Sequence, residues 1–305
     1  MSFLIKILGS NSAMPAHDRN HTAQLIKIQN QYFLIDCGEG TQMQLVRYKV
    51  RFHRINHIFI SHLHGDHYFG LIGLLSTMHL QGRKNAIHIY GPKGLSEILL
   101  VQFKYTHTVL NYQIIFHALK PDSKEIIYED QHIEVETIPL DHRIDCTGFL
   151  FREKIKPYKL NKETLPKDLS LKQIATLKKG EDIINGDGQI KYHNTALTLG
   201  PKKSRTYAYC SDTRYTEDIL PQIKNVDVLY HEATFLKEKS DRAADTFHST
   251  AEQAATIAFK ANAGKLMLGH FSTRYKDLDP VLDEAKTVFD NTIIAEEGME
   301  IAIEE

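Results

Sequence analysis

The sequence has few cysteines, no long hydrophobic run and almost no net charge. Its three cysteines, Cys37, Cys146 and Cys210, are too few and too scattered for a disulfide framework or a thiolate zinc site. No apolar run reaches the roughly 18 residues that a membrane helix needs, and the N-terminus lacks a charged region and a cleavage site. The formal net charge of −1 gives no overall sign of a nucleic-acid partner, although a balanced total can conceal a local patch. We therefore expect a cytoplasmic protein with reduced thiols.

The chain of 305 residues is instead rich in histidine and patterned as an α/β protein. Its 42% hydrophobic and 25% charged residues are ordinary for a globular protein. Expected elements include a strand over residues 55–60 and helices over residues 69–80, 216–223 and 251–261. Ser249 or Thr250 caps the last helix, and Glu252, three residues after Ser249, suits a capping box. The 17 histidines need an explanation, because imidazole is the commonest metal ligand.

Residues 152–180 differ in character from the rest of the chain. They contain nine Lys/Arg against three Asp/Glu, two prolines and no sustained hydrophobic period. We interpret residues 154–200, approximately, as a flexible basic arm inserted into a single domain that spans residues 1–305. On composition alone, a solvated surface excursion and a functional basic patch explain the segment equally well.

The most informative segment is Ser61-His62-Leu63-His64-Gly65-Asp66-His67. Its four potential metal ligands fall within six residues, directly after an apolar strand and directly before a helix. Imidazole combined with carboxylate favours zinc or another borderline divalent ion over Mg²⁺ or Ca²⁺. His62 and His64 can share one ion, and Asp66 and His67 can serve a second ion nearby.

Three further candidate ligands, His142, Asp212 and His270, each follow another predicted strand. An open α/β sheet gathers its functional groups at strand ends. Each residue taken alone is more often structural, but together with the histidine cluster they favour a metal site. A carboxylate such as Asp212 can bridge two cations, whereas an imidazole cannot.

The segment from His62 to His67 resembles the signature of the metallo-β-lactamase superfamily, and the spacing to the three later candidates fits its other ligand motifs. Further motifs are similar to those of the ribonuclease Z family, which processes the 3′ ends of tRNA. They are Asp36-Cys37-Gly38-Glu39-Gly40-Thr41-Gln42, residues 61–71, His231-Glu232-Ala233-Thr234-Phe235 and His248-Ser249-Thr250-Ala251. The resemblance covers nearly the whole chain.

The resemblance implies both a fold and a metal centre. The fold is the metallo-β-lactamase fold, a four-layer αβ/βα sandwich with two mixed β-sheets. The strand–helix alternation agrees with this α/β architecture but does not single it out. The implied metal centre holds two Zn²⁺ ions per subunit. One ion would be bound by His62, His64 and His142, and the other by Asp66, His67 and His270. Asp212 would bridge the two ions.

The resemblance also implies catalytic roles for Asp66, His248 and Glu232. A shared water ionised by the two metal ions would attack the phosphorus, with Asp66 orienting it or taking its proton. His248 would stabilise or protonate the departing ribose 3′ oxygen, and Glu232 would orient His248. The structural alternatives are a neighbour of the helix cap for His248 and a satisfied carboxylate at a strand end for Glu232.

Two segments depart from the family pattern. The family loop Pro-x-Lys-x-Arg-Asn reads Pro-Ala-His-Asp-Arg-Asn over residues 15–20, so His17 replaces a lysine. Arg19 and Asn20 remain candidate substrate contacts, although a polar turn explains this loop equally well. The arm lacks the family's Gly-Pro signature but keeps its basic character, and we expect its terminal Lys178 and Lys179 to bind RNA phosphates.

The function implied is a zinc-dependent endoribonuclease that removes the 3′ trailer from precursor tRNA, leaving a 3′-hydroxyl on the tRNA and a 5′-phosphate on the trailer. The alternative enzyme is a phosphodiesterase of the same fold that acts on a small cyclic or aryl diester. A β-lactamase, a thioesterase and a non-catalytic RNA-binding protein are further alternatives. The family also implies a homodimer in which the arm of one subunit serves the site of the other, with no membrane partner.

Overall fold

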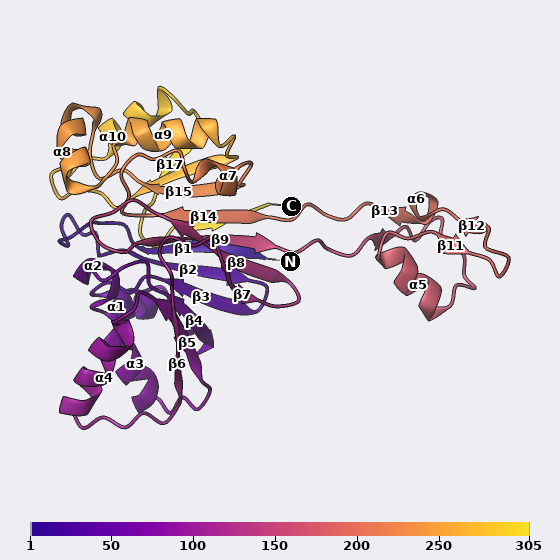
Figure 1. Cartoon of the computed structure of the whole chain (residues 1–305), viewed down its shortest axis with the longest axis horizontal. Coiled ribbons are helices and arrows are strands. Elements are labelled where there is room, and N and C mark those ends of the chain that lie inside the picture. The colour runs from indigo at the N-terminus through magenta and orange to yellow at the C-terminus, as the bar shows by residue number, and fades with distance from the viewer. Residues whose placement is uncertain (1, 305) are drawn as a thin grey trace.

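The computed structural model describes residues 2–304, which form two seven-stranded sheets packed face to face (Figure 1). The first sheet has the order β18-β1-β2-β3-β4-β5-β6, and the second has the order β17-β16-β15-β14-β9-β8-β7. In each sheet an antiparallel half joins a parallel half: β3 to β6 are parallel in the first sheet and β14 to β17 in the second. Both sheets are therefore mixed, as predicted.

Along the chain, the strands of these sheets alternate with the helices that cover them. The first sheet and its helices are β1 (Phe3–Gly9), β2 (Ala23–Ile28), β3 (Gln31–Ile35), α1 (Thr41–Arg47), β4 (Ile55–Phe59), α2 (Gly65–Tyr68), α3 (Leu71–Leu80), β5 (Ile87–Gly91), α4 (Leu95–Tyr105), β6 (Ile114–Ala118) and β18 (Glu300–Ala302). The second comprises β7 (Ile126–Glu129), β8 (Ile133–Pro139), β9 (Thr147–Glu153), β14 (Thr206–Cys210), α7 (Leu220–Ile223), β15 (Val228–Glu232), α8 (Ser240–Thr246), α9 (Ala251–Lys260), β16 (Lys265–Gly269), α10 (Asp279–Lys286) and β17 (Thr292–Ile294).

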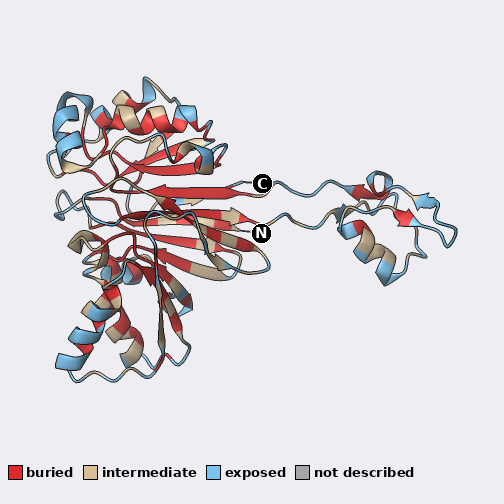
Figure 2. Ribbon diagram, viewed as in Figure 1, coloured by how far each residue is buried: buried red, intermediate tan, exposed pale blue. Residues whose placement is uncertain are grey.

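Three apolar clusters separate the layers. One cluster fills the space between the sheets and contains large buried rings such as Phe33, Phe149 and Tyr207. The second packs α1, α3 and α4 on the outer side of the first sheet, and the third packs α7, α9 and α10 on the second. Figure 2 shows the buried strands lying between helices with exposed outer surfaces. This helix–sheet–sheet–helix order confirms the predicted four-layer sandwich. No helix within residues 2–304 is long and apolar enough to cross a bilayer.

Helix α9 begins at the predicted place but with a different capping box. The Thr250 hydroxyl accepts a hydrogen bond from the Gln253 amide at 3.2 Å, and the Gln253 side chain accepts one from the Thr250 amide at 2.9 Å. The pairing of Ser249 with Glu252 was wrong because Ser249 is used elsewhere. Its hydroxyl donates to the Thr213 carbonyl at 2.7 Å and its amide donates to Glu232 at 3.1 Å.

The predicted helix over residues 216–223 is only one turn long. Helix α7 is Leu220–Ile223 and has a proline, Pro221, in its first turn. Proline lacks an amide hydrogen and disfavours helical geometry in the residue before it, so the helix cannot extend backward through this point. The sequence reasoning also missed β7, β18 and α8, which are short or lack a clear hydrophobic period.

Residues 154–204 form an arm that projects from the end of the sandwich on two extended segments (Figure 1). The far end of this arm is folded rather than irregular. Helix α5 (Leu171–Lys178) has a Ser170–Gln173 capping box, and two small ladders pair β10 (Lys159–Leu160) with β13 (Thr198–Leu199) and β11 (Ile183–Ile184) with β12 (Ile190–Tyr192). Short helix α6 (Asn194–Leu197) completes it, and Leu177, Ile183 and Leu197 form a small core.

The root of the arm is held by a buried ion pair. Glu153 ends β9 and Arg205 precedes β14, and each is 2% exposed. The Arg205 guanidinium donates from Nε and Nη2 to the two Glu153 carboxylate oxygens at 2.8 and 2.6 Å, and from Nη1 to the Ile303 carbonyl at 2.9 Å. Burial alone would raise the pKa of Glu153, but the hydrogen bonds from Arg205 and from Lys156, whose Nζ lies 2.9 Å from Oε2, outweigh it and hold that pKa at about 2.

Glu153→Ala is expected to destabilise the protein by about 3–5 kcal/mol, because it removes the carboxylate that the buried guanidinium binds. The double variant Glu153→Leu/Arg205→Met is expected to lose far less, since replacing a buried pair by apolar side chains is often nearly neutral. Urea unfolding followed by circular dichroism measures both. A double variant at least as unstable as Glu153→Ala would contradict the assignment of this pair as a coupled unit.

Candidate active site

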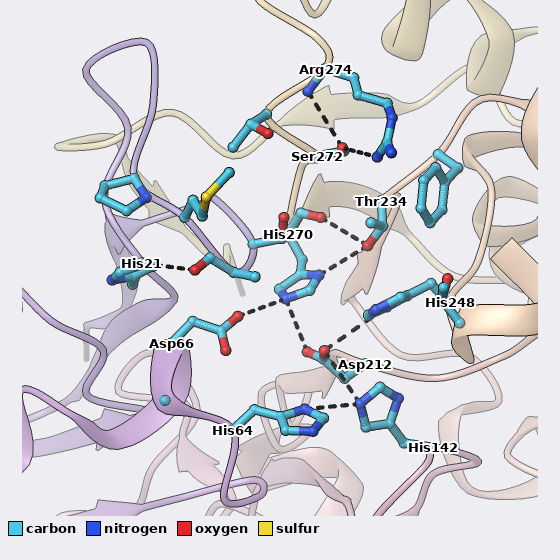
Figure 3. A pocket seen from close by; sticks show the side chains of 18 of the residues that line it. His21, His64, Asp66, His142, Asp212, Thr234, His248, His270, Ser272 and Arg274 are labelled. Atoms are coloured by element: carbon cyan, nitrogen blue, oxygen red, sulfur yellow. Dashed lines mark hydrogen bonds and ion pairs between the residues drawn. The ribbon is translucent and has the colours of Figure 1, made fainter. Parts of the chain in front are cut away.

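Five of the seven predicted metal ligands line one pocket at the edge where strands of both sheets end. The pocket has a volume of about 750 Å³, and its lining includes His64, Asp66, His142, Asp212 and His270. Figure 3 shows these side chains pointing toward one another from opposite halves of the sandwich. Segments far apart in the sequence therefore contribute to one concave site, as the strand-end argument predicted.

The first group of candidate ligands contains His62, His64, His142 and Asp212. Nδ1 of His64 lies 3.0 Å from Nε2 of His62 and 3.2 Å from Nε2 of His142. Oδ1 of Asp212 lies 3.8 Å from both of those Nε2 atoms. Burial is the main cause that lowers the pKa of all three imidazoles, which keeps them neutral and leaves a lone pair available.

The second group contains Asp66, His67 and His270. Nε2 of His67 and Nε2 of His270 each lie 3.5 Å from Oδ2 of Asp66. The other oxygen of Asp212, Oδ2, lies 3.1 Å from Nε2 of His67 and 3.3 Å from Nε2 of His270. Asp212 therefore presents one carboxylate oxygen to each group, which is the geometry that a bridging ligand needs.

In four of the candidate ligand histidines, a neighbour holds the second ring nitrogen and fixes the tautomer. Nδ1 of His142 donates to the Phe247 carbonyl at 3.0 Å, and Nδ1 of His67 donates to the Asp36 carboxylate at 2.7 Å. The Ser61 hydroxyl donates to Asp36 at 2.9 Å and is thus the acceptor for Nδ1 of His62 at 3.0 Å. In their neutral forms all three therefore carry the proton on Nδ1 and turn Nε2 into the pocket as a possible metal ligand.

His270 follows the same rule. The Thr234 hydroxyl lies 2.6 Å from the Glu232 carboxylate, which can only accept, so that hydroxyl donates there and accepts from Nδ1 of His270 at 2.9 Å. Within residues 2–304, Nε2 of His67 and of His270 are buried and make no hydrogen bond. Imidazole nitrogens without a hydrogen-bond partner thus face the carboxylates of Asp66 and Asp212, and this set of donor atoms fits a site for borderline divalent metal ions.

The charge balance supports the same conclusion. Burial lowers the pKa of His67, but the carboxylates of Asp212, Asp36 and Asp66 outweigh burial and raise it well above the usual value. Burial would raise the pKa of Asp212, but the imidazoles of His270, His67 and His62 lower it well below the usual range. The carboxylates of Asp66 and Asp212 both line the pocket, and bound cations would neutralise their negative charge.

Three of the residues at the site have left-handed backbone geometry within two residues of a strand end. Asp36, Asp212 and His270 have φ values of 55°, 59° and 58°. Such values are uncommon outside glycine, and aspartate, asparagine and histidine are the side chains that tolerate them best. The sharp turn at the end of β3, β14 and β16 brings each side chain to the edge of the sandwich, and the surrounding hydrogen bonds stabilise the turn.

His248 and Glu232 lie beside the ligand groups. Nδ1 of His248 is 3.0 Å from Oε1 of Glu232, which is fully buried and also accepts the Thr213 amide at 2.7 Å. Burial lowers the pKa of His248, but the Glu232 carboxylate outweighs burial and raises it to about 9. Nδ1 of His248 is also 3.9 Å from Oδ1 of Asp212, so His248 falls within a third group of possible ligands. Its place outside the metal shell stays a prediction.

The sequence reasoning did not assign roles to Asp36, Ser61 and Thr234, the side chains that hold the imidazoles. Asp36 is fully buried and accepts from the Ser61 amide at 2.8 Å and from the Tyr209 hydroxyl at 2.7 Å, in addition to His67. All three lie within motifs that the sequence analysis quoted, next to strand ends. The sequence could therefore mark these three residues as polar neighbours of the ligand motifs, but it did not show which ligand each one contacts.

The predicted substrate contacts lie in two different places. Arg19 donates from Nε to the Asn11 side chain at 3.1 Å, from Nη2 to the Tyr275 carbonyl at 2.5 Å and from Nη1 to the Lys276 carbonyl at 3.3 Å. The Asn20 amide group donates to Glu297 at 2.7 Å. Both residues thus join the loop over residues 12–20 to neighbouring loops, and their contact with substrate stays a prediction. Lys178 and Lys179 are exposed at the end of α5, on the arm.

Other exposed cations lie at the pocket itself. Arg143 and Arg274 both line it and are exposed. Arg274 extends from the loop after β16 and contacts the Ser272 hydroxyl from Nη1 at 3.3 Å (Figure 3). The sequence analysis did not single out either arginine, because isolated surface arginines carry no motif.

Comparisons with known proteins agree on the fold and the family. A family model described as anti-Pycsar protein Apyc1 matches residues 3–158, and a model described as beta-lactamase superfamily domain matches residues 149–271. A ribonuclease Z from Cytophaga hutchinsonii is 53% identical over 298 residues, covering 98% of this chain and 95% of that protein. A ribonuclease Z from Bacteroides fragilis is 44% identical over 302 residues, covering 99% of both chains.

Solved structures show the same likeness. The short form of human tRNase Z superposes with a TM-score of 0.72 at 27% identity, covering 99% of this chain and 100% of that chain. The metallo-β-lactamase-fold protein YhfI from Bacillus subtilis superposes with a TM-score of 0.68 at 20% identity, covering 99% and 100%, and its likeness shows the fold alone.

Thr234→Val is expected to weaken metal binding roughly tenfold to a hundredfold, because residues that orient metal-bound histidines contribute about that much to affinity. Valine keeps the volume of threonine but removes the hydroxyl that joins Glu232 to His270. Competition with a fluorescent zinc chelator measures the affinity. Thr256→Val in α9 is the matched control, since its hydroxyl bonds only the Glu252 carbonyl of its own helix. Equal affinities in both variants and the wild type would contradict this role for Thr234.

Proposed function

The chain belongs to the ribonuclease Z family of the metallo-β-lactamase fold, and from that premise we propose how its residues remove the 3′ trailer from precursor tRNA. The proposal rests mainly on the position of Asp212, which presents one carboxylate oxygen to each of the two ligand groups. His248 and Glu232 lie beside these groups, 3.0 Å apart. The enzyme is a tRNA 3′-processing endoribonuclease, and phosphodiester hydrolysis leaves a 3′-hydroxyl on the tRNA and a 5′-phosphate on the trailer. The small-diester alternative is not favoured by relatives that match the full chain and are named ribonuclease Z.

We propose two Zn²⁺ ions per subunit as the cofactor. His62, His64 and His142 would hold one ion, Asp66, His67 and His270 the other, and Asp212 both. Two such ions supply charge neutralisation for the phosphate oxygens and an acidified water at neutral pH. The neutral histidines and the buried carboxylates are the donor set that zinc prefers over Mg²⁺ or Ca²⁺.

Asp66 and His248 carry the proton transfers. Oδ2 of Asp66 faces His67 and His270, so its other oxygen is left to orient the attacking water and accept its proton. As the bond between phosphorus and the ribose 3′ oxygen breaks, that oxygen needs a proton. His248 supplies it from the outer side of the site, and the Glu232 carboxylate at 3.0 Å keeps the imidazole protonated and correctly oriented.

Substrate binding combines the pocket rim with the arm. Arg143 and Arg274 line the pocket, and we propose that they contact phosphates near the scissile bond. The basic arm, with Lys178 and Lys179 at the end of α5, is proposed to grip the tRNA body through its phosphates, a contact that depends on shape and salt rather than on sequence.

We also propose a homodimer and a cytoplasmic location. Helices α1, α3 and α4 carry large exposed apolar side chains on the outer side of the first sheet: Met43, Val46, Leu80, Leu100, Val101 and Tyr105. Exposed apolar patches of this kind mark association surfaces, and a two-fold interface uses the same patch on both subunits. In that dimer, the arm of one subunit would serve the site of the other.

His248→Ala is expected to lower the turnover of precursor tRNA by about 10²–10⁴, the usual contribution of general acid catalysis, while bound zinc stays at the wild-type level. The loss is expected to be much smaller with a chromogenic aryl phosphodiester, whose leaving group needs no proton. Single-turnover cleavage assays and metal analysis of the purified variant test this. Asp66→Ala is the comparison variant and is expected to abolish cleavage of both substrates. Loss of zinc from His248→Ala would contradict its place outside the metal shell.

The arm can be removed at a defined point, because the backbones of Glu153 and Arg205 pair across its root. We expect a variant in which Asn-Gly replaces residues 154–204 to close as a two-residue hairpin and to keep the sandwich intact. Its kcat/KM on precursor tRNA is expected to fall at least about a hundredfold at physiological salt, since several phosphate contacts are lost. Hydrolysis of the aryl diester is expected to stay unchanged. Equal loss on both substrates would contradict the arm as an RNA-binding element.

A further inference from the structure

A second strongly basic surface lies outside both the active site and the arm. A cavity of about 290 Å³ opens on the outer face of the first sheet, between β1, β2 and β3 and the loop that joins α1 to β4. Its lining contains five cationic residues and one acidic residue. We call it the basic groove and define it by these five cations: Lys6, Lys27, Lys49, Arg51 and Arg54.

The positive charge of the basic groove is almost uncompensated. Its single carboxylate, Glu300, lies 2.8 Å from Lys6. Within residues 2–304, the other four cations lie within 4.0 Å of no carboxylate. A chain with a net charge of −1 therefore concentrates about four positive charges in one hollow. Like charges gathered in one hollow repel one another, so the binding of a polyanion stabilises the arrangement.

Two half-buried tyrosines lie among these cations. The ring centre of Tyr32 is 5.2 Å from the Arg54 guanidinium carbon and 5.9 Å from Lys27 Nζ. The ring centre of Tyr48 is 5.5 Å from Lys6 Nζ. Aromatic rings interleaved with cations along a groove are the arrangement that binds single-stranded nucleic acid, with phosphates on the cations and bases stacked on the rings.

The position of the groove relates it to the catalytic pocket. Tyr32 lies near the start of β3 and Asp36 directly follows its end, so the length of one five-residue strand, about 17 Å, separates the two sites. Helix α1 spans a similar gap: it begins next to Gly38 and Asn20 at the pocket side and ends at Tyr48 in the groove. A strand of RNA a few nucleotides long is enough to connect them.

We propose that the basic groove binds the single-stranded 3′ trailer of the precursor after it leaves the catalytic pocket. The proposal rests on the endonuclease function stated above. The paired acceptor stem offers its phosphates but not its base faces, so tyrosines at this place suit only an unpaired strand. The trailer is the unpaired strand that extends from the scissile bond itself. The groove would then make long-trailer precursors better substrates than short-trailer ones.

Arg51→Glu/Arg54→Glu tests the groove with two substrates, precursors of one tRNA that carry trailers of about 2 and about 20 nucleotides. Both arginines are exposed and precede β4, so the change leaves the core intact. We expect KM for the long-trailer precursor to rise about tenfold while kcat and all constants for the short-trailer precursor stay unchanged. We also expect the slope of log affinity against log salt to become shallower by about 1.4, because two contacts to a single strand are lost at about 0.7 each.

Lys124→Glu/Lys224→Glu is the matched control, since it makes the same charge change at exposed positions that do not line the groove. The proposal is overturned if the groove variant matches this control on the long-trailer precursor, or if both precursors lose affinity equally, which would place the contact on the tRNA body. Cleavage of the short-trailer precursor by the wild-type enzyme reports the endonuclease function separately. If the wild-type enzyme failed to cleave this precursor, that result would contradict the proposed function rather than the proposal for the basic groove.

Discussion

The burial of several carboxylates at one edge of the sandwich is the constraint on which the site depends. Asp36 and Asp212 are almost completely buried, and Asp66 lies beside them. An ionised carboxylate is costly to remove from water unless cations or hydrogen-bond donors surround it. Imidazoles from both sheets supply part of that environment, and the arrangement of their unprotonated nitrogens leaves the remaining part to metal ions.

The same constraint joins the two sheets to one another. Asp36 follows β3 in the first sheet and accepts the hydroxyl of Tyr209 from β14 in the second. Asp212 follows β14 and faces His62 and His67, which come from the first half of the chain. Any shift between the sheets would separate these groups, so the packing of the large rings between the sheets also positions the catalytic site. The left-handed turns at Asp36, Asp212 and His270 persist because these contacts hold both sides of each turn.

Chemistry and substrate binding occupy different parts of the molecule. The groups proposed to act on the phosphodiester lie at rigid strand ends, whereas the cations proposed to hold RNA lie at the rim, on the arm and in the basic groove. This separation explains how a chain with almost no net charge can bind a polyanion: the cations are concentrated locally and the carboxylates are buried around the metal site or dispersed. A buried ion pair at the root of the arm joins the two segments of the sandwich from which the arm extends.

The motifs in the sequence, through their resemblance to a family, indicated the fold, and they contained the candidate metal ligands that the structure brings together around Asp212. The run from His62 to His67 and the residues that follow later strands could be identified because ligand chemistry restricts residue type and because strand ends share an edge. Local patterns failed where an element was shaped by its neighbours, as at the one-turn helix α7 and the capping box of α9, in which Ser249 serves Glu232 instead. Only the tertiary structure decided which oxygen of Asp212 faces which ligand group, which neighbour fixes each histidine tautomer, and where the basic groove lies. Those features depend on contacts between residues far apart in the chain, and such contacts leave no period or spacing in the sequence.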